Sequence, residues 1–100
     1  MGSPGASVAA EAALRIEDVP RVSRQFRLQY EDAQSAWVLL YPEGMVKLSQ
    51  SAGEIMKRID GRTTIDALIG DLEAAFPGAA LRQDVLDFMK VAHERGWISA

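Results

Sequence analysis

The sequence predicts an α+β fold in which a three-stranded antiparallel sheet is followed by a three-helix bundle. Two observations support this class. Apolar, β-prone runs occupy residues 26–48, and apolar side chains at helical spacing, with capping residues beside them, occupy residues 49–95. Because the strands and helices are segregated along the chain and do not alternate, the α+β class is favoured over α/β.

The first two strands are predicted from hydrophobic periodicity. Residues 26–30 alternate apolar and polar side chains, which is typical of a strand with one buried face. The polar residues 31–35 would form a hairpin loop. The next run, residues 37–41, is apolar at every position, so we expect a central strand or a strand covered by another element.

A tight hairpin is predicted between the second and third strands. Pro42 favours the first corner of a type I turn, and Gly44 tolerates the left-handed conformation of a glycine bulge. The third strand, residues 45–48, would place its valine and leucine on one face and its methionine and lysine on the other.

The first helix is predicted from its capping residues. Ser51 and Glu54 fit a capping box, and Ser49 is a competing cap. Apolar residues between positions 55 and 59 then give one stripe, and Asp60-Gly61 would end the helix in a left-handed turn.

Two more helices complete the predicted bundle. A threonine at position 63 or 64 would cap the second helix, and the Pro-Gly pair at 77–78 would stop it. The third helix would cover residues 82–95, with Gly96 as its C-cap. We expect the Trp-Ile pair at 97–98 to pack the end of the chain against the core.

The length of 100 residues predicts a single domain. Residues 1–14 are small and turn-prone, so we expect a disordered or extended tail, or a short alanine-rich helix that packs on a partner. Residues 15–100 would form the folded domain. The N-terminus lacks the regions of a signal peptide, and no apolar run approaches the roughly 20 residues of a membrane span, so a cytoplasmic location is expected.

Composition argues against several classes of function. The absence of cysteine excludes disulfides and thiolate chemistry, and the single histidine, His93, argues against the usual multi-histidine metal sites. The chain has no phosphate loop and no dinucleotide motif. We therefore expect no catalytic residue, no metal, no cofactor and no enzyme activity.

The net charge of −3 argues against nucleic acid or an anionic membrane as the main partner. Three helices with a hairpin could nevertheless form a winged helix-turn-helix that reads DNA. Against this, the predicted third helix carries three basic and three acidic side chains, and Glu43 lies at the hairpin tip, where a DNA-binding wing prefers a cation. DNA binding remains one alternative, and a purely structural dimerisation module is another.

The predicted third helix holds more apolar residues than one core contact needs. One interpretation is a well-buried final helix. In the other, Val85, Phe88 and Ala92 face the core, while Leu86 and Met89 line a groove beside the third strand. An extended peptide could then pair with the strand edge in that groove. The same edge could pair with a second copy of the chain, so a homodimer is a further prediction.

Four runs of the sequence point to a known family. They are Arg27-Leu28-Gln29-Tyr30, Trp37-Val38-Leu39-Leu40-Tyr41-Pro42-Glu43-Gly44, Asp60-Gly61 with Thr63-Thr64-Ile65, and Gly96-Trp97-Ile98. Together they resemble the PqqD family, pyrroloquinoline quinone (PQQ) biosynthesis protein D. The resemblance covers residues 16–99, and the run from Trp37 to Gly44 is its most specific part.

The resemblance implies a RiPP recognition element, which is a non-catalytic, winged-helix-like domain. Such domains bind the ribosomally made precursor peptide of PQQ and present it to a radical SAM enzyme, which joins a glutamate to a tyrosine within the peptide. The iron–sulfur clusters and S-adenosylmethionine belong to that enzyme. The peptide pairs beside the third strand and lies against the third helix. By position, the implied peptide-binding residues are Met45, Val46, Lys47, Leu48, Val85, Leu86, Met89 and His93.

Overall fold

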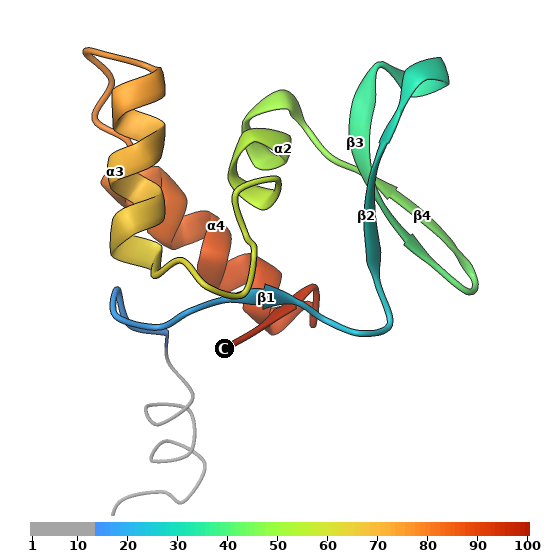
Figure 1. Cartoon of the computed structure of the whole chain (residues 1–100). Helices are drawn as coiled ribbons and strands as arrows, with labels where there is room; N and C mark the ends of the chain where they lie inside the picture. The colour runs from blue at the N-terminus through green and yellow to red at the C-terminus, as the bar shows by residue number, and fades with distance from the viewer. Residues whose placement is uncertain (1–13) are drawn as a thin grey trace, which may run out of the picture.

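The computed structural model describes residues 14–100, so almost all of the predicted tail at residues 1–14 lies outside the described residues. The elements follow one another along the chain in the arrangement of Figure 1. They are β1 (Arg21–Val22), β2 (Arg27–Glu31), the 3-10 helix η1 (Asp32–Gln34), β3 (Ala36–Tyr41), β4 (Gly44–Lys47), α2 (Gln50–Met56), α3 (Ile65–Ala75), α4 (Arg82–Glu94) and β5 (Ile98–Ser99). The α+β class, with a three-stranded sheet before three helices, is confirmed.

The three-stranded antiparallel sheet has the order β2-β3-β4, with β3 in the centre. Leu39 of β3 lies opposite Leu28 of β2 and Val46 of β4. Val38 and Leu39 point to opposite faces of β3, and both are fully buried. This burial explains why the run is apolar at every position, and it confirms the predicted central strand.

The turn between β3 and β4 differs from the prediction. Tyr41 pairs directly with Gly44, which leaves Pro42 and Glu43 as a two-residue loop. Gly44 does not have a positive φ, so the predicted glycine bulge is wrong. A Cβ at Gly44 would lie 3.2 Å from the Tyr41 hydroxyl oxygen, so glycine is favoured at this position because it leaves room for the Tyr41 side chain.

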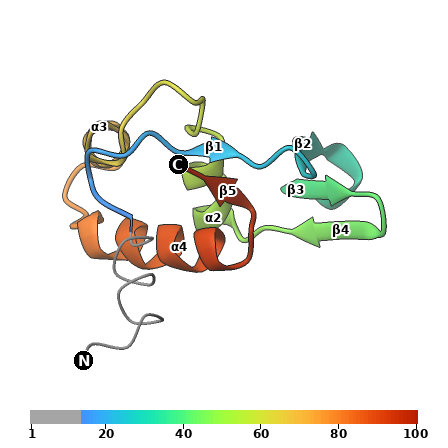
Figure 2. The same ribbon diagram turned by 90° about the horizontal axis from the view of Figure 1, so that it is seen from below.

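A second, two-stranded sheet joins the beginning and the end of the described chain (Figures 1 and 2). β1 pairs antiparallel with β5, with Val22 opposite Ile98. The Ser23 N–H extends this contact by donating to the Trp97 carbonyl at 2.9 Å. Strands of two residues leave no hydrophobic periodicity, so the sequence pattern does not predict this sheet.

The helix ends follow most of the predicted signals. Ser49 caps α2 by accepting the backbone N–H three residues ahead at 3.1 Å, so the competing cap is correct and the capping box at Ser51 is wrong. Thr64 caps α3 in the same way. Gly61 (φ +74°) and Gly96 (φ +75°) adopt the predicted left-handed conformation after α2 and α4.

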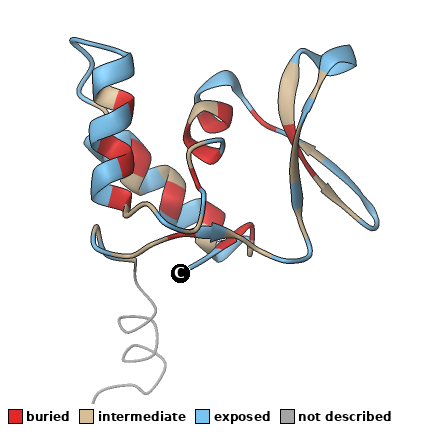
Figure 3. Ribbon diagram, viewed as in Figure 1, coloured by how far each residue is buried: buried red, intermediate tan, exposed pale blue. Residues whose placement is uncertain are grey.

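The hydrophobic core lies among the three helices and continues to the inner face of the sheet (Figure 3). Its largest fully buried side chains include Leu39, Met56, Ile65, Leu68, Ile69, Val85, Met89 and Ile98. The helix α2 joins the sheet to the bundle. A Cβ at Gly53 would lie 2.9 Å from Trp37 Cδ1, so the glycine lets the backbone of α2 approach β3. Within residues 14–100, none of the helices has both the length and the apolar character needed to cross a membrane.

Candidate functional site

The strand β4 forms one edge of the sheet, and its outer side pairs with no other strand among residues 14–100. The Leu48 N–H donates to the Trp37 carbonyl at 3.0 Å, which identifies the bonded positions of the ladder. Bonded and non-bonded pairs alternate in an antiparallel ladder. Met45 and Lys47 therefore direct their backbone N–H and C=O groups away from β3, and both residues are exposed.

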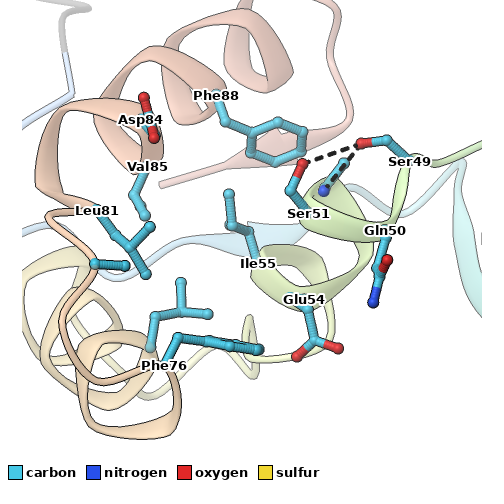
Figure 4. A pocket seen from close by; sticks show the side chains of 13 residues that line it. Ser49, Gln50, Ser51, Glu54, Ile55, Phe76, Leu81, Asp84, Val85 and Phe88 are labelled. Carbon is cyan, nitrogen blue, oxygen red and sulfur yellow. Dashed lines mark hydrogen bonds between the residues drawn. The ribbon is translucent and has the colours of Figure 1, made fainter.

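An open pocket of about 650 Å³ begins where β4 ends (Figure 4). Figure 2 shows that β4 is the strand of its sheet on the side of α4. The pocket lies between the start of α2, the end of α3 and the start of α4. It is lined by Ser49, Gln50, Ser51, Ala52, Glu54, Ile55, Leu72, Phe76, Ala79, Leu81, Asp84, Val85 and Phe88.

The pocket has an apolar floor and a polar rim. Ile55 and Val85 are buried at the floor, and Phe76 at the end of α3 is 43% exposed. Phe88 stands at the opposite wall, beside Ser51 (Figure 4). The Phe88 ring lies 6.3 Å from the Trp97 ring, which supports it from behind. Such a pocket suits an apolar side chain whose backbone remains near the rim.

The Glu54 carboxylate at the rim is charge-paired. Arg58 donates to Glu54 Oε1 at 2.9 Å and to Asp71 Oδ2 at 2.7 Å, and the Lys57 ammonium lies 3.2 Å from the same Glu54 oxygen. The hydrogen bond from Arg58 lowers the pKa of Glu54 below its ordinary value, although desolvation acts in the opposite direction. Glu54 is therefore ionised at neutral pH, and its role is to anchor α2 to α3 through Arg58.

The structure places three of the predicted site residues in the core. Met89 is 0% exposed, Val85 is 1% exposed and Leu48 is 5% exposed. The prediction that Met89 lines an open groove is therefore wrong, because its side chain fills space between the helices. Val85 contributes to the pocket floor, whereas Leu48 packs beneath the sheet.

Two other predicted residues lie on the far side of α4 from the pocket. At 100° per residue, Leu86 lies about 160° and His93 about 140° around the helix from Phe88. Leu86 and His93 are both half-buried, and neither lines the pocket. Phe88, predicted to face the core, is half-buried: it packs against the edge of the core and forms the pocket wall beside Ser51 (Figure 4). The i, i+4, i+7 stripe of Val85, Met89 and Ala92 is the sequence signal that identifies Phe88 as a flanking residue.

The strand edge, the adjoining apolar pocket and the α+β topology together define a small recognition domain of the kind that can accept an extended segment. Among residues 14–100 there is no group of three or more His, Asp and Glu side chains that could hold a metal ion.

The family model for coenzyme PQQ synthesis protein D (PqqD) matches residues 36–98, and the chain belongs to this family. A protein of Pseudomonas aeruginosa named PqqA binding protein is 49% identical over 84 residues, which cover 83% of this chain and 91% of that protein. A protein of the same name from Acinetobacter baylyi is 43% identical over 96 residues, which cover 91% and 97% of the two chains.

The fold also matches a solved structure. The solution NMR structure of the PqqD truncation of Methylobacterium extorquens PqqCD is described as a functional, stand-alone RiPP recognition element. It matches with a TM-score of 0.73 and 25% sequence identity, covering 89% of this chain and 97% of that one. The resemblance inferred from the sequence is thus confirmed.

Proposed function

We propose that this chain is a peptide-binding adaptor in the synthesis of coenzyme PQQ and binds the precursor peptide PqqA as an added strand along β4. One observation carries the proposal. The outward-facing backbone groups of Met45 and Lys47 lead directly into the apolar pocket that begins at Ser49. A peptide strand would gain backbone hydrogen bonds from this edge, and alternate side chains would supply selectivity. The name of the relatives, PqqA binding protein, supports this choice of ligand.

The geometry suggests how the predicted contact residues divide their roles. Met45 and Lys47 would contact the peptide through backbone and side chain, and Val46, whose backbone bonds β3, through its side chain alone. Leu48, Val85 and Met89 would support the site from within the core. Past Leu48, an apolar side chain of the peptide would enter the pocket against Phe88. Leu86 and His93, on the other flank of α4, lie off this path.

The role of the chain would be non-catalytic. The pocket has an apolar floor, and the Glu54 carboxylate at its rim is paired with Arg58, an arrangement that suits ligand binding better than acid–base chemistry. A radical SAM enzyme would supply the iron–sulfur clusters, the S-adenosylmethionine and the crosslink between glutamate and tyrosine. The adaptor would raise the local concentration of the peptide at this enzyme, or fix the conformation of the peptide there. Both steps are expected in the cytoplasm.

A matched pair of variants on α4 tests the proposed path. Phe88 and Leu86 are both half-buried, but they lie on opposite flanks of the helix. Isothermal titration with synthetic PqqA should show that Phe88→Ala weakens binding by about tenfold, because an aromatic wall is lost. Leu86→Ala should change the affinity by less than about twofold.

Circular dichroism would first establish that both variants are folded. Equal loss of affinity in the two variants would move the peptide away from the pocket, and a loss for Leu86→Ala alone would place the peptide on the opposite flank of α4. Absence of binding by the wild-type chain, with and without the radical SAM enzyme, would contradict the proposed function itself.

A further inference from the structure

The second edge of the three-stranded sheet, β2, is also unpaired among residues 14–100. In Figure 2 it lies on the side of the sheet away from α4, so it does not border the pocket. The sequence of β2 is Arg27-Leu28-Gln29-Tyr30-Glu31. Gln29 is the middle residue, with the basic Arg27 two positions before it and the acidic Glu31 two positions after it.

The ladder fixes which backbone groups of β2 are available. β3 uses Trp37 and Leu39 to bond β4, so the alternate residues of β3, including Val38, face β2. Val38 lies opposite Gln29. Gln29 and the two charged ends of β2 therefore point their backbone groups toward β3, and Leu28 and Tyr30 point theirs toward the free edge.

We propose that β2 pairs with β2 of a second copy of the chain, antiparallel and centred on Gln29, to form a six-stranded sheet across a two-fold axis. In this register Leu28 of each copy lies opposite Tyr30 of the other. Both of these pairs use the outward-facing backbone groups, and each exchanges two hydrogen bonds. Only registers that pair outward-facing residues with one another can form hydrogen bonds between the copies, and this register does so.

Charge complementarity selects this register. Arg27 of each copy lies opposite Glu31 of the other, so the same attractive pair forms twice. A pairing centred on Arg27 would oppose two arginines, and a pairing centred on Glu31 would oppose two glutamates. Among the described residues neither side chain has an ion-pair partner within its own chain. Glu31 accepts a hydrogen bond from Gln29 through Oε2 at 2.9 Å, which leaves Oε1 for the arginine.

The exposed side chain of Tyr30 is the second observation. Tyr30 is 47% exposed, more than any other large apolar side chain in residues 14–100. Its ring makes an edge contact with Trp37 at 5.6 Å, which holds it on the face of the sheet that carries Leu28. Pairing with a second copy would cover this ring with Leu28 of that copy. Aromatic and aliphatic cross-strand neighbours stabilise such pairs.

The interface would be weak, because five residues per copy bury a small area. It would also leave β4 free in both copies, so that a dimer would present two peptide sites on the outer edges of one sheet. The inference therefore does not depend on the proposed peptide site, and the two can fail separately.

Sedimentation equilibrium of the full chain at concentrations up to about 1 mM tests the inference, since association of that strength remains measurable there. The variants are Arg27→Glu, Glu31→Arg and the double exchange. Each single reversal changes both charge pairs from attractive to repulsive, so the dissociation constant should rise by about tenfold or more. The double exchange restores both pairs and should bring the constant back to within about threefold of the wild type.

Mixing the two single variants gives the sharpest readout. Chains with Arg27→Glu and chains with Glu31→Arg oppose unlike charges at both pairs, so they should form a heterodimer more tightly than either associates with itself. The control is Lys47→Glu on the β4 edge, which should leave the wild-type dissociation constant unchanged. A wild-type chain that stays monomeric at 1 mM would overturn the inference. The inference would also be overturned if the single variants associated as tightly as the wild type, or if neither the double exchange nor the mixture restored association. A rise of the dissociation constant in Lys47→Glu equal to that in the single reversals would overturn it as well.

Discussion

The two edges of the three-stranded sheet share one backbone pattern but have different surroundings. β4 runs into the Ser49 cap of α2 and the apolar pocket beside Phe88. β2 lies away from α4 and carries opposite charges at its two ends. Free hydrogen-bonding groups alone make any strand edge ready to pair. The neighbours of each edge therefore decide whether it suits a foreign peptide or another copy of the same strand.

The largest expected effect is a loss of stability at the buried face of α4. Met89→Glu places a charge at a position that is 0% exposed, so the free energy of unfolding should fall by about 3–5 kcal/mol. Met45→Glu is the matched control. Because Met45 is 43% exposed on the strand, this substitution should lower the free energy of unfolding by less than about 0.5 kcal/mol. Urea denaturation measures both values. A stable Met89→Glu chain would mean that this side chain reaches solvent and belongs to the peptide site after all.

The next effect separates the two edges directly. The backbone N–H groups of Met45 and Tyr30 both point away from β3, one on each edge. Proline at either position removes an outward donor and blocks the edge, but it breaks no bond to β3. Met45→Pro should weaken PqqA binding by about tenfold or more, whereas Tyr30→Pro should leave it within about twofold.

The same pair should behave in the opposite way in sedimentation, where only Tyr30→Pro should weaken self-association. If both prolines reduced peptide affinity equally, the two edges would not be distinct in function.

A smaller effect concerns the junction that holds the sheet, and thus both edges, on the helices. Gly53→Ala would bring a Cβ within 2.9 Å of Trp37 Cδ1, so the free energy of unfolding should fall by about 1 kcal/mol despite the higher helix propensity of alanine. Gly70→Ala on α3 is the control, because the added Cβ would meet nothing within 4 Å. This substitution should stabilise the protein by about 0.5–1 kcal/mol through the higher helix propensity of alanine. Thermal unfolding of both variants gives the comparison, and a stabilised Gly53→Ala chain would show that α2 and β3 do not pack this closely.

The smallest effect is a pH dependence at the pocket rim. The pKa of Glu54 is lowered by Arg58, so the pair contributes stability above the ordinary glutamate pKa and loses it as the pH falls through the lower folded value. Partly exposed pairs of this kind contribute about 0.5–1 kcal/mol, which should be lost as the pH falls below the ordinary glutamate pKa. In Glu54→Gln the loss of stability between pH 6 and pH 3 should be smaller by about this amount, measured by urea denaturation at each pH. An identical pH profile in the variant would show that the Glu54 pair contributes no net stability.

The sequence predicted the parts of the fold that depend on local periodicity. The apolar run at residues 37–41 corresponds to the central strand, in which Val38 and Leu39 are fully buried. On α4, Val85 and Ala92 are buried as predicted, whereas Met89, predicted to line a groove, is buried with them. The choice between Ser49 and Ser51 as the cap of α2 could not be made locally, since both serines precede the same helix. The pairing of β1 with β5 depends on contacts between the two ends of the domain, which no short pattern records.

The location of the candidate site was predicted only in part. The prediction that Met45 and Lys47 share one face of the third strand agrees with the structure, in which both are exposed. The helical flank beside the pocket was not predicted, because a helix with apolar residues on most of its surface can rotate about its axis without changing the pattern. The packing of Trp97 against Phe88 and the burial of Met89 set that rotation. These are contacts between elements, and the spacing within α4 does not encode them.

Amide hydrogen exchange of the isotope-labelled chain, followed by NMR with and without saturating PqqA, tests the central claim most directly. Strand addition at β4 would slow exchange at the Met45 and Lys47 amides, because the peptide would accept hydrogen bonds from them. The Leu28 and Tyr30 amides should keep the exchange rates that they have without peptide. Protection at Leu28 and Tyr30 with none at Met45 and Lys47, under conditions where the peptide is bound, would contradict the account and assign the peptide to the opposite edge.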